Sequence, residues 1–288
     1  MDTSMLSFLV APFAASLILT GIHAYLGVHV VERGVIFVDL SLAQIAALGA
    51  TIAILLPISG GDPHAPVVYW ISLAFTFLGA FVFSMIRVKR ARIPQEAIIG
   101  ICYAVASAAA IVAMSKATSE SEHLKDMLVG NILAVSWPEV GKTAALYGGI
   151  GLFHFIFRKQ FLAISMDHRQ AERTGLNVRL WDFLFYASFG FVVTSSVSIA
   201  GVLLVFCYLI VPSVAAMLYS DSVGKRLAIG WTMGTVVSAL GVYASLQLDL
   251  PTGATIVCTF GLVLIIMAAV RPLFPHAASA HAVQELRH

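Results

Sequence analysis

Two polar side chains lie inside one of the most apolar stretches of the chain. Asp39 and Gln44 belong to LGVHVVERGVIFVDLSLAQIAALG, residues 26–49. Carboxylate and amide oxygens can bind a metal cation, and an ionised carboxylate among apolar side chains is costly unless a partner or water compensates its charge. The stretch therefore predicts a functional site that includes Asp39 and Gln44.

Helical spacing limits how these two side chains can cooperate. Asp39 and Gln44 are five positions apart, which places them about 140° apart around an α-helix. They cannot chelate one ion as a simple pair unless the helix is locally unwound or a second copy of the chain supplies further ligands.

Two more side chains are weaker candidates, each with a structural alternative. His23 lies in the preceding apolar stretch, and imidazole is a common transition-metal ligand. The alternative is a histidine hydrogen-bonded to a neighbouring helix. Glu96 follows Pro94, where an acid at the start of a helix favours capping over metal binding.

The composition sets the class of protein that must position these residues. Apolar residues make up 59% of the 288 residues, charged residues make up 11%, and the mean hydropathy is +0.92. Such a chain cannot hide its apolar surface in a water-soluble domain. A net charge of +2 without a basic patch argues against nucleic-acid binding. We expect an all-α polytopic membrane protein.

A membrane-spanning helix needs about 20 mostly apolar residues, and the chain supplies such stretches repeatedly. We predict nine spans, near residues 5–28, 35–58, 66–86, 95–115, 138–157, 181–199, 201–220, 227–247 and 253–270. The sixth and seventh are close together around Gly201, so one of them could be a broken half-helix. The spans form one transmembrane domain, residues 1–271, followed by a tail at 272–288.

The positions of Lys and Arg predict the orientation, because cytoplasmic loops retain positive charge. The loops at 29–34, 87–94, 158–180 and 221–226, together with Arg271 and the tail, hold every basic residue except Lys116, Lys125 and Lys142. This split predicts an N-terminus outside and a cytoplasmic C-terminus, in the inner (plasma) membrane.

The long loop at 158–180 has the features of a coupling element. Residues 166–174 predict a short polar helix, with Asp167 near its start and Gly175 as its stop. Such a helix can dock into a cytosolic partner, or it can serve only to anchor the loop at the membrane surface. The candidate coupling residues are Asp167, Arg169, Glu172, Gly175 and Leu176.

Several blocks in order make the chain similar to a known family. They are the stretch at 26–49, EAIIGICYAVASAAA, EHLKDMLVGNILAVSWPEV, AERTGLNV, SIAGVLLVFCYLIVPSVAAML and LQLDLPTGATIV. The chain resembles the permease subunits of metal-uptake ABC transporters, the ABC-3 family, which import zinc, manganese or iron.

The resemblance implies an assembly of several chains. It implies a permease dimer, with a second copy or a paralogue as the mate. It also implies cytosolic ATPases that contact the loop around 167–176 and bind ATP, and an external solute-binding protein that delivers the divalent metal ion. The chain itself would hold no cofactor and catalyse no bond chemistry. Consistently, it contains no complete G-x-x-x-x-G-K-S/T phosphate-binding loop.

The chain departs from the family at the candidate ligands. Family members typically read Phe-x-Gly-Asp, with a histidine four residues after the aspartate, and these two side chains are the usual metal ligands. Without gaps, the aspartate position falls on Leu40, the histidine position on Gln44 and the glycine position on Asp39. An amide in place of an imidazole weakens the expected preference for zinc-like metals.

Zinc or manganese is the expected substrate, and two alternatives stay open. One is a permease of the same fold with a different substrate. The other is an ATP-independent secondary carrier, which would predict an internal inverted repeat; no convincing repeat is visible in the sequence.

Overall fold

The computed structural model describes residues 3–60, 62, 65–86, 94–114 and 132–273. In this part of the chain all regular structure is helical. The ten α-helices are α1 (Thr3–Glu32), α2 (Val38–Leu55), α3 (Pro66–Ile86), α4 (Gln95–Met114), α6 (Trp137–Ile156), α7 (Arg158–Met166), α8 (His168–Arg173), α9 (Val178–Met217), α10 (Val223–Leu248) and α11 (Thr252–Val270). Most of the predicted tail lies outside the described residues.

The predicted spans agree with these helices. By length and composition, seven helices can cross a membrane, and the bent pair α6 and α7 provides an eighth span. Helix α9 has 40 residues and a length of about 60 Å, twice what a bilayer core of about 30 Å requires. Counted as two arms, α9 brings the described helices to the nine spans expected.

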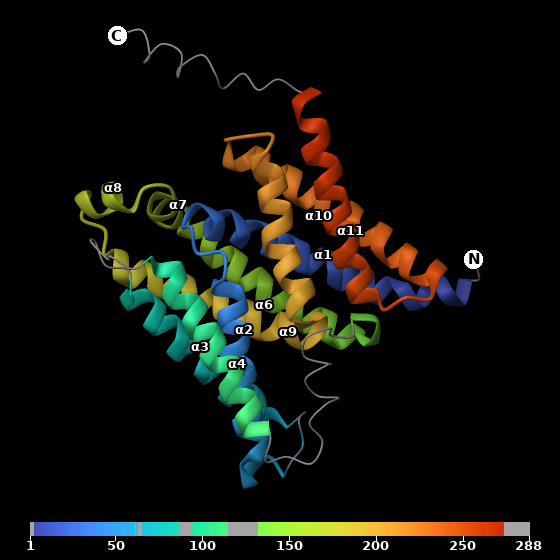
Figure 1. Ribbon diagram of the computed structural model, residues 1–288, viewed down its shortest axis with the longest axis horizontal. Coiled ribbons are helices and arrows are strands. Elements are labelled where there is room, and N and C mark those ends of the chain that lie inside the picture. The colour runs from blue at the N-terminus through green and yellow to red at the C-terminus, as the bar shows by residue number, and fades with distance from the viewer. Residues whose placement is uncertain (1–2, 61, 63–64, 87–93, 115–131, 274–288) are drawn as a thin grey trace.

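The two arms of α9 meet at Gly201. Its φ of 74° and ψ of 161° are not helical, and this backbone region is essentially restricted to glycine. The closeness of the sixth and seventh predicted spans is therefore a sharp break within one long helix. Figure 1 shows the bend between the two arms.

Helix α9 is the centre of the packing. It contacts α1, α2, α3, α10 and α11. Its first arm carries three of the largest fully buried side chains, Phe185, Tyr186 and Phe189. Helices α2, α3 and α4 lie together on one side of it, and α10 packs against α11 on the other (Figure 1). The outward faces of α4 and α11 carry exposed large apolar side chains, as expected for surfaces that face lipid.

The first connection differs from the prediction. The loop expected at 29–34 is mostly helix, because α1 continues to Glu32. It ends in a Schellman motif, in which the N–H of Val35 donates to the carbonyl of Val30 and Gly34 adopts a φ of 66°. Only residues 33–37 connect α1 to α2, so the last turn of α1 is packed inside the protein.

Candidate cation site and coupling region

Asp39 lies in the first turn of α2 and is 1% exposed. Neither of its carboxylate oxygens has a hydrogen-bond partner among the described residues. The N-terminus of α2 is a favourable place for an acid because the helix dipole is positive there. This interaction typically stabilises an exposed carboxylate by about 0.3–1 kcal/mol. Such a stabilisation is small beside the several kcal/mol that burying an unpaired carboxylate costs.

The surroundings of Asp39 offer it little compensation. Val38, Leu42 and Ala43 on the same helix are buried and apolar. The thiol of Cys207 on α9 is close enough to interact with Asp39 electrostatically, but a thiol carries no compensating positive charge. Among the described residues, Asp39 is therefore a buried acid without a compensating charge, and a cation would supply one.

Glu96 provides a second carboxylate at the same end of α2. Its Oε1 accepts a hydrogen bond of 2.9 Å from the backbone N–H of Phe37, the residue that precedes α2. Its Oε2 is buried, and no described residue forms a hydrogen bond with it. The sequence predicted a cap for the start of Glu96's own helix. Instead, Glu96 reaches from α4 to the backbone just before α2.

Gln44 is half-buried, and its amide makes no hydrogen bond among the described residues. Helix α2 is regular over Val38–Leu55, so local unwinding does not bring Gln44 round to Asp39. In the described part of the chain, no group of three or more His, Cys, Asp or Glu side chains is arranged to hold a metal ion. A complete site would need ligands from outside this arrangement.

His23 is fully buried on α1 and has a partner on each ring nitrogen. Nδ1 donates to the carbonyl of Leu19 at 2.8 Å, and Nε2 faces the hydroxyl of Ser196 on α9 at 3.2 Å. The ring also packs edge-on against Tyr147. This geometry matches the structural alternative for His23, a histidine hydrogen-bonded to a neighbouring helix.

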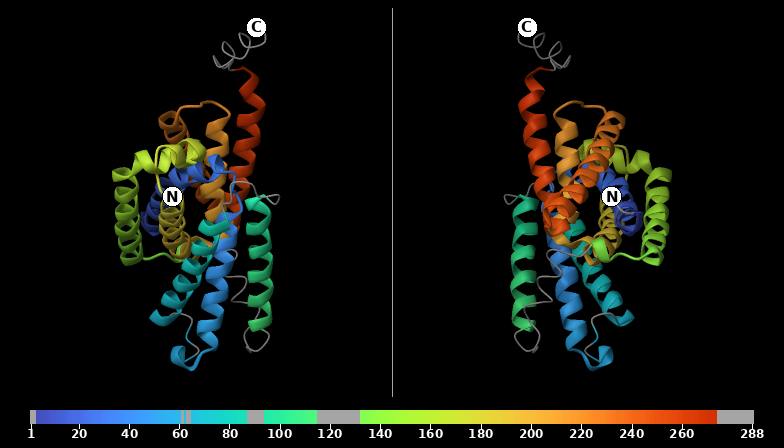
Figure 2. Two further views of the ribbon diagram at one scale, coloured as in Figure 1. Left: turned by 90° about the vertical axis from the view of Figure 1, so that its left-hand side faces the viewer. Right: turned by 90° about the vertical axis from the view of Figure 1, so that its right-hand side faces the viewer.

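The predicted coupling helix is present as α8. The Asp167 carboxylate caps its start by accepting from the N–H of Gln170 at 3.0 Å. At its end, Gly175 has a φ of 84°, and the N–H of Leu176 donates to the carbonyl of Ala171 in a second Schellman motif. Arg169 and Glu172 are exposed. Figure 2 shows α7 and α8 at the edge of the molecule.

Helix α7 was not predicted, and it connects α8 to the long transmembrane helices. It follows α6 after a bend of 75°. Phe161, Ile164 and Ser165 form its buried face. The spacing of these three residues is amphipathic, and this was the available sequence signal. Only Asp167 separates α7 from α8.

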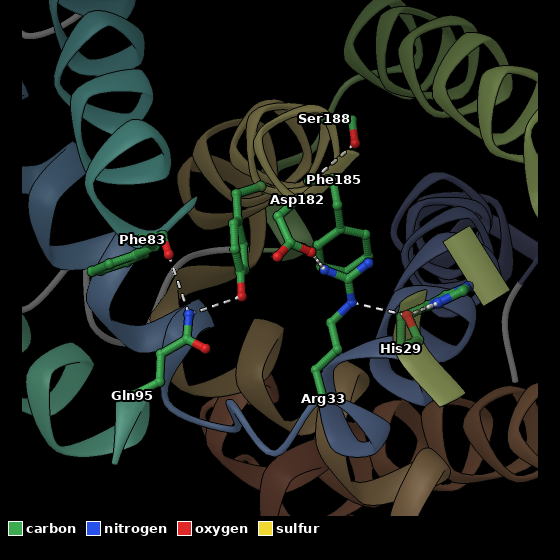
Figure 3. A network of polar contacts seen from close by, with 9 residues as sticks. His29, Arg33, Phe83, Gln95, Asp182, Phe185 and Ser188 are labelled. Carbon is green, nitrogen blue, oxygen red and sulfur yellow. Dashed lines mark hydrogen bonds and ion pairs between the residues drawn. The ribbon is translucent and has the colours of Figure 1, made fainter. Parts of the chain in front are cut away.

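A buried polar network joins α7 to α1 and α9. The Arg33 guanidinium lies 2.6 Å from the Asp182 carboxylate, and Nε of Arg33 donates to the hydroxyl of Ser165 at 2.9 Å. The same hydroxyl lies 2.8 Å from Nδ1 of His29. Figure 3 shows Arg33 between Asp182, Phe185 and His29. The sequence placed Arg33 in the loop at 29–34, and it does follow the end of α1, but its side chain is buried in the protein and does not face water.

The fold and this site define a polytopic helical membrane protein with a buried acid and a peripheral polar helix. The model of the ABC 3 transport family matches residues 5–271. The chain belongs to this family, as the sequence blocks predicted.

Curated relatives carry names of metal transporters. The chain is 30% identical to the manganese transport system membrane protein MntC of Listeria innocua, over 68% of this chain and 71% of the relative. It is 25% identical to the chelated iron transport system membrane protein YfeD of Yersinia pestis, over 73% and 74%.

A solved structure has the same fold. PsaBC from Streptococcus pneumoniae in complex with Fab matches with a TM-score of 0.75 at 23% identity, covering 98% of this chain and 95% of the matched chain.

Proposed function

We propose that the chain is the permease subunit of an ATP-driven importer of a divalent transition-metal ion. The single observation that carries this proposal is Asp39, a buried carboxylate whose two oxygens have no partner in the part of the chain that the structure describes. The names of the relatives, which transport manganese or chelated iron, support a metal as the substrate.

The donor set favours manganese or iron(II) over zinc. Asp39 and Gln44 offer oxygen atoms on α2, and Glu96 adds another carboxylate at its start. Oxygen ligands suit manganese, whereas zinc more often takes imidazole or thiolate. A sparse set of ligands also suits a transport path, since an ion must bind weakly enough to leave.

The path runs along α2 at the interface of two permeases. Asp39 and Gln44 point about 140° apart on a regular helix, so one chain alone does not complete a coordination shell. A second copy or a paralogue would contribute the remaining ligands.

The partners follow from the same proposal. The N-terminus lies outside and the C-terminus lies in the cytoplasm of the inner (plasma) membrane. A solute-binding protein delivers the ion from outside. Cytosolic ATPases dock on α8 through Asp167, Arg169, Glu172, Gly175 and Leu176. ATP binding then shifts the dimer between inward-open and outward-open populations.

Reconstitution tests this function. The permease, its ATPase and its binding protein are placed in proteoliposomes, and uptake of manganese, iron(II) and zinc is measured with and without ATP. We expect ATP-dependent uptake with manganese or iron preferred. Uptake of the same rate without the ATPase would instead establish a secondary carrier.

A further inference from the structure

Ser165 is the point at which the helix leading to α8 is hydrogen-bonded to the last turn of α1. Its side chain is buried on α7. The hydroxyl oxygen accepts from Nε of Arg33 at 2.9 Å and lies 2.8 Å from Nδ1 of His29. These two partners are separated by one helical turn of α1, so a single hydroxyl fastens α7 to that turn.

The chemistry of the contact requires a hydroxyl group. A guanidinium can only donate, so Ser165 must accept from Arg33. Its single hydrogen is then available to Nδ1 of His29, whose lone pair can accept it. The hydroxyl thus acts as acceptor and donor at once, which neither alanine nor a carboxylate reproduces.

Arg33 is itself held tightly. Its side chain is 0% exposed, and that of its partner Asp182 is 1% exposed. The guanidinium also lies over the ring of Phe185, 3.9 Å from the centroid, where a cation is attracted to the aromatic face. Charge-assisted hydrogen bonds of this kind are short and geometrically specific. Arg33, which Figure 3 shows beside Asp182 and Phe185, therefore gives Ser165 a fixed partner.

The last turn of α1 connects onward to the other transmembrane helices. Glu32 forms an ion pair with Arg226 on α10. Earlier in α1, His23 lies within hydrogen-bond distance of Ser196 on α9. The end of α1 is thus linked by polar contacts to α7, α9 and α10, and a displacement of α7 would reach all of them.

We propose that Ser165 is a positioning residue that transmits movement of α8 to α1, and so couples the ATPase to the transport path. This inference rests on the proposed function, because it needs an ATPase docked on α8. Helix α7 has nine residues and is joined to α8 by one residue. A displacement of α8 by the ATPase therefore displaces α7 as well. Without the Ser165 hydroxyl, α7 moves while α1 stays behind.

The test compares Ser165→Ala with the control Ser198→Ala in the reconstituted importer. Ser198 is exposed, and its hydroxyl bonds only within α9, to the carbonyl of Ser195. Metal uptake and ATP hydrolysis are measured together, and the result is the number of ions imported per ATP hydrolysed. A misfolded fraction lowers both rates equally and leaves this ratio unchanged.

We expect Ser165→Ala to lower the ratio about tenfold, within the range of measured allosteric couplings, while ATP hydrolysis stays within about twofold of wild type. Hydrogen exchange should show that ATP still changes protection in α8 but no longer in residues 26–33. An unchanged ratio, or an unchanged response of residues 26–33, would overturn the inference. Failure of the wild-type complex to import metal with ATP would instead refute the proposed function.

Discussion

The Arg33 guanidinium and the Asp182 carboxylate form an ion pair of 2.6 Å between the end of α1 and the start of α9, and neither side chain is more than 1% exposed. The two residues are 149 positions apart in the chain. The pair fixes the end of α1 beside the helix that carries most of the core.

Removing one member of this pair should destabilise the protein strongly. Asp182→Ala leaves the Arg33 charge buried without its carboxylate, which typically costs about 3–5 kcal/mol. Thermal unfolding in detergent measures the loss. Asp221→Ala is the matched control, because Asp221 lies 3.6 Å from Arg226 with its side chain 78% exposed, and such pairs contribute about 1 kcal/mol or less. Equal losses in both variants would contradict this role of the pair.

Gly201→Ala should destabilise the protein through the backbone. A side chain at a φ of 74° and a ψ of 161° costs about 1–3 kcal/mol. Gly148→Ala is the control, because Gly148 lies within α6 and a Cβ there meets no atom within 4 Å. Alanine in a helix is favoured by about 1 kcal/mol over glycine, so the control should be neutral or stabilising. Urea or thermal unfolding of both variants separates the two effects.

His23→Ala should lower stability without changing metal selectivity. Both ring nitrogens have partners, and alanine removes these two hydrogen bonds and the packing of a buried ring; each hydrogen bond typically contributes about 0.5–1.5 kcal/mol. Competition between manganese and zinc in the uptake assay is the measurement. A shift in the manganese-to-zinc ratio at unchanged thermal stability would show that His23 is a ligand after all.

Charge reversal on α8 should weaken ATPase docking while leaving the membrane part intact. Arg169 is exposed on α8, outside the buried network around Ser165. Arg169→Glu should reduce copurification of the ATPase, and higher salt should reduce binding of the wild type as well, since exposed charges are screened. Lys225→Glu, an exposed change at the start of α10, is the control. Equal ATPase recovery with both variants would argue against docking on α8.

Helix positions were predictable from the sequence, and the polar network was not. Apolar runs of about 20 residues identify spans directly, and Gly175 marked the end of α8. Helix α7 was missed because one short amphipathic helix beside a span resembles a polar loop. The burial of Arg33 was missed because a basic residue between two spans usually faces water. Its burial depends on Asp182 and Ser165, which are brought beside it only by the tertiary fold.

For the candidate ligands, too, the sequence predicted the segment that holds the site but not the contacts made between helices. The apolar context of Asp39 was enough to predict a site on α2. The reach of Glu96 to the backbone of Phe37 was not predictable, because it depends on how α4 packs against α2.

The most direct test of the account is metal uptake by Asp39→Asn in the reconstituted importer, with Asp249→Asn as control. Asparagine keeps the shape of the side chain and removes its charge, and Asp249 is an exposed acid in a left-handed turn that asparagine also tolerates. We predict that Asp39→Asn lowers uptake at least about tenfold, the equivalent of about 1.4 kcal/mol. The folded protein should be as stable as wild type or more stable, because an unpaired buried carboxylate has been removed. Uptake by Asp39→Asn at the wild-type rate would contradict the role of Asp39 as a ligand of the transported metal ion.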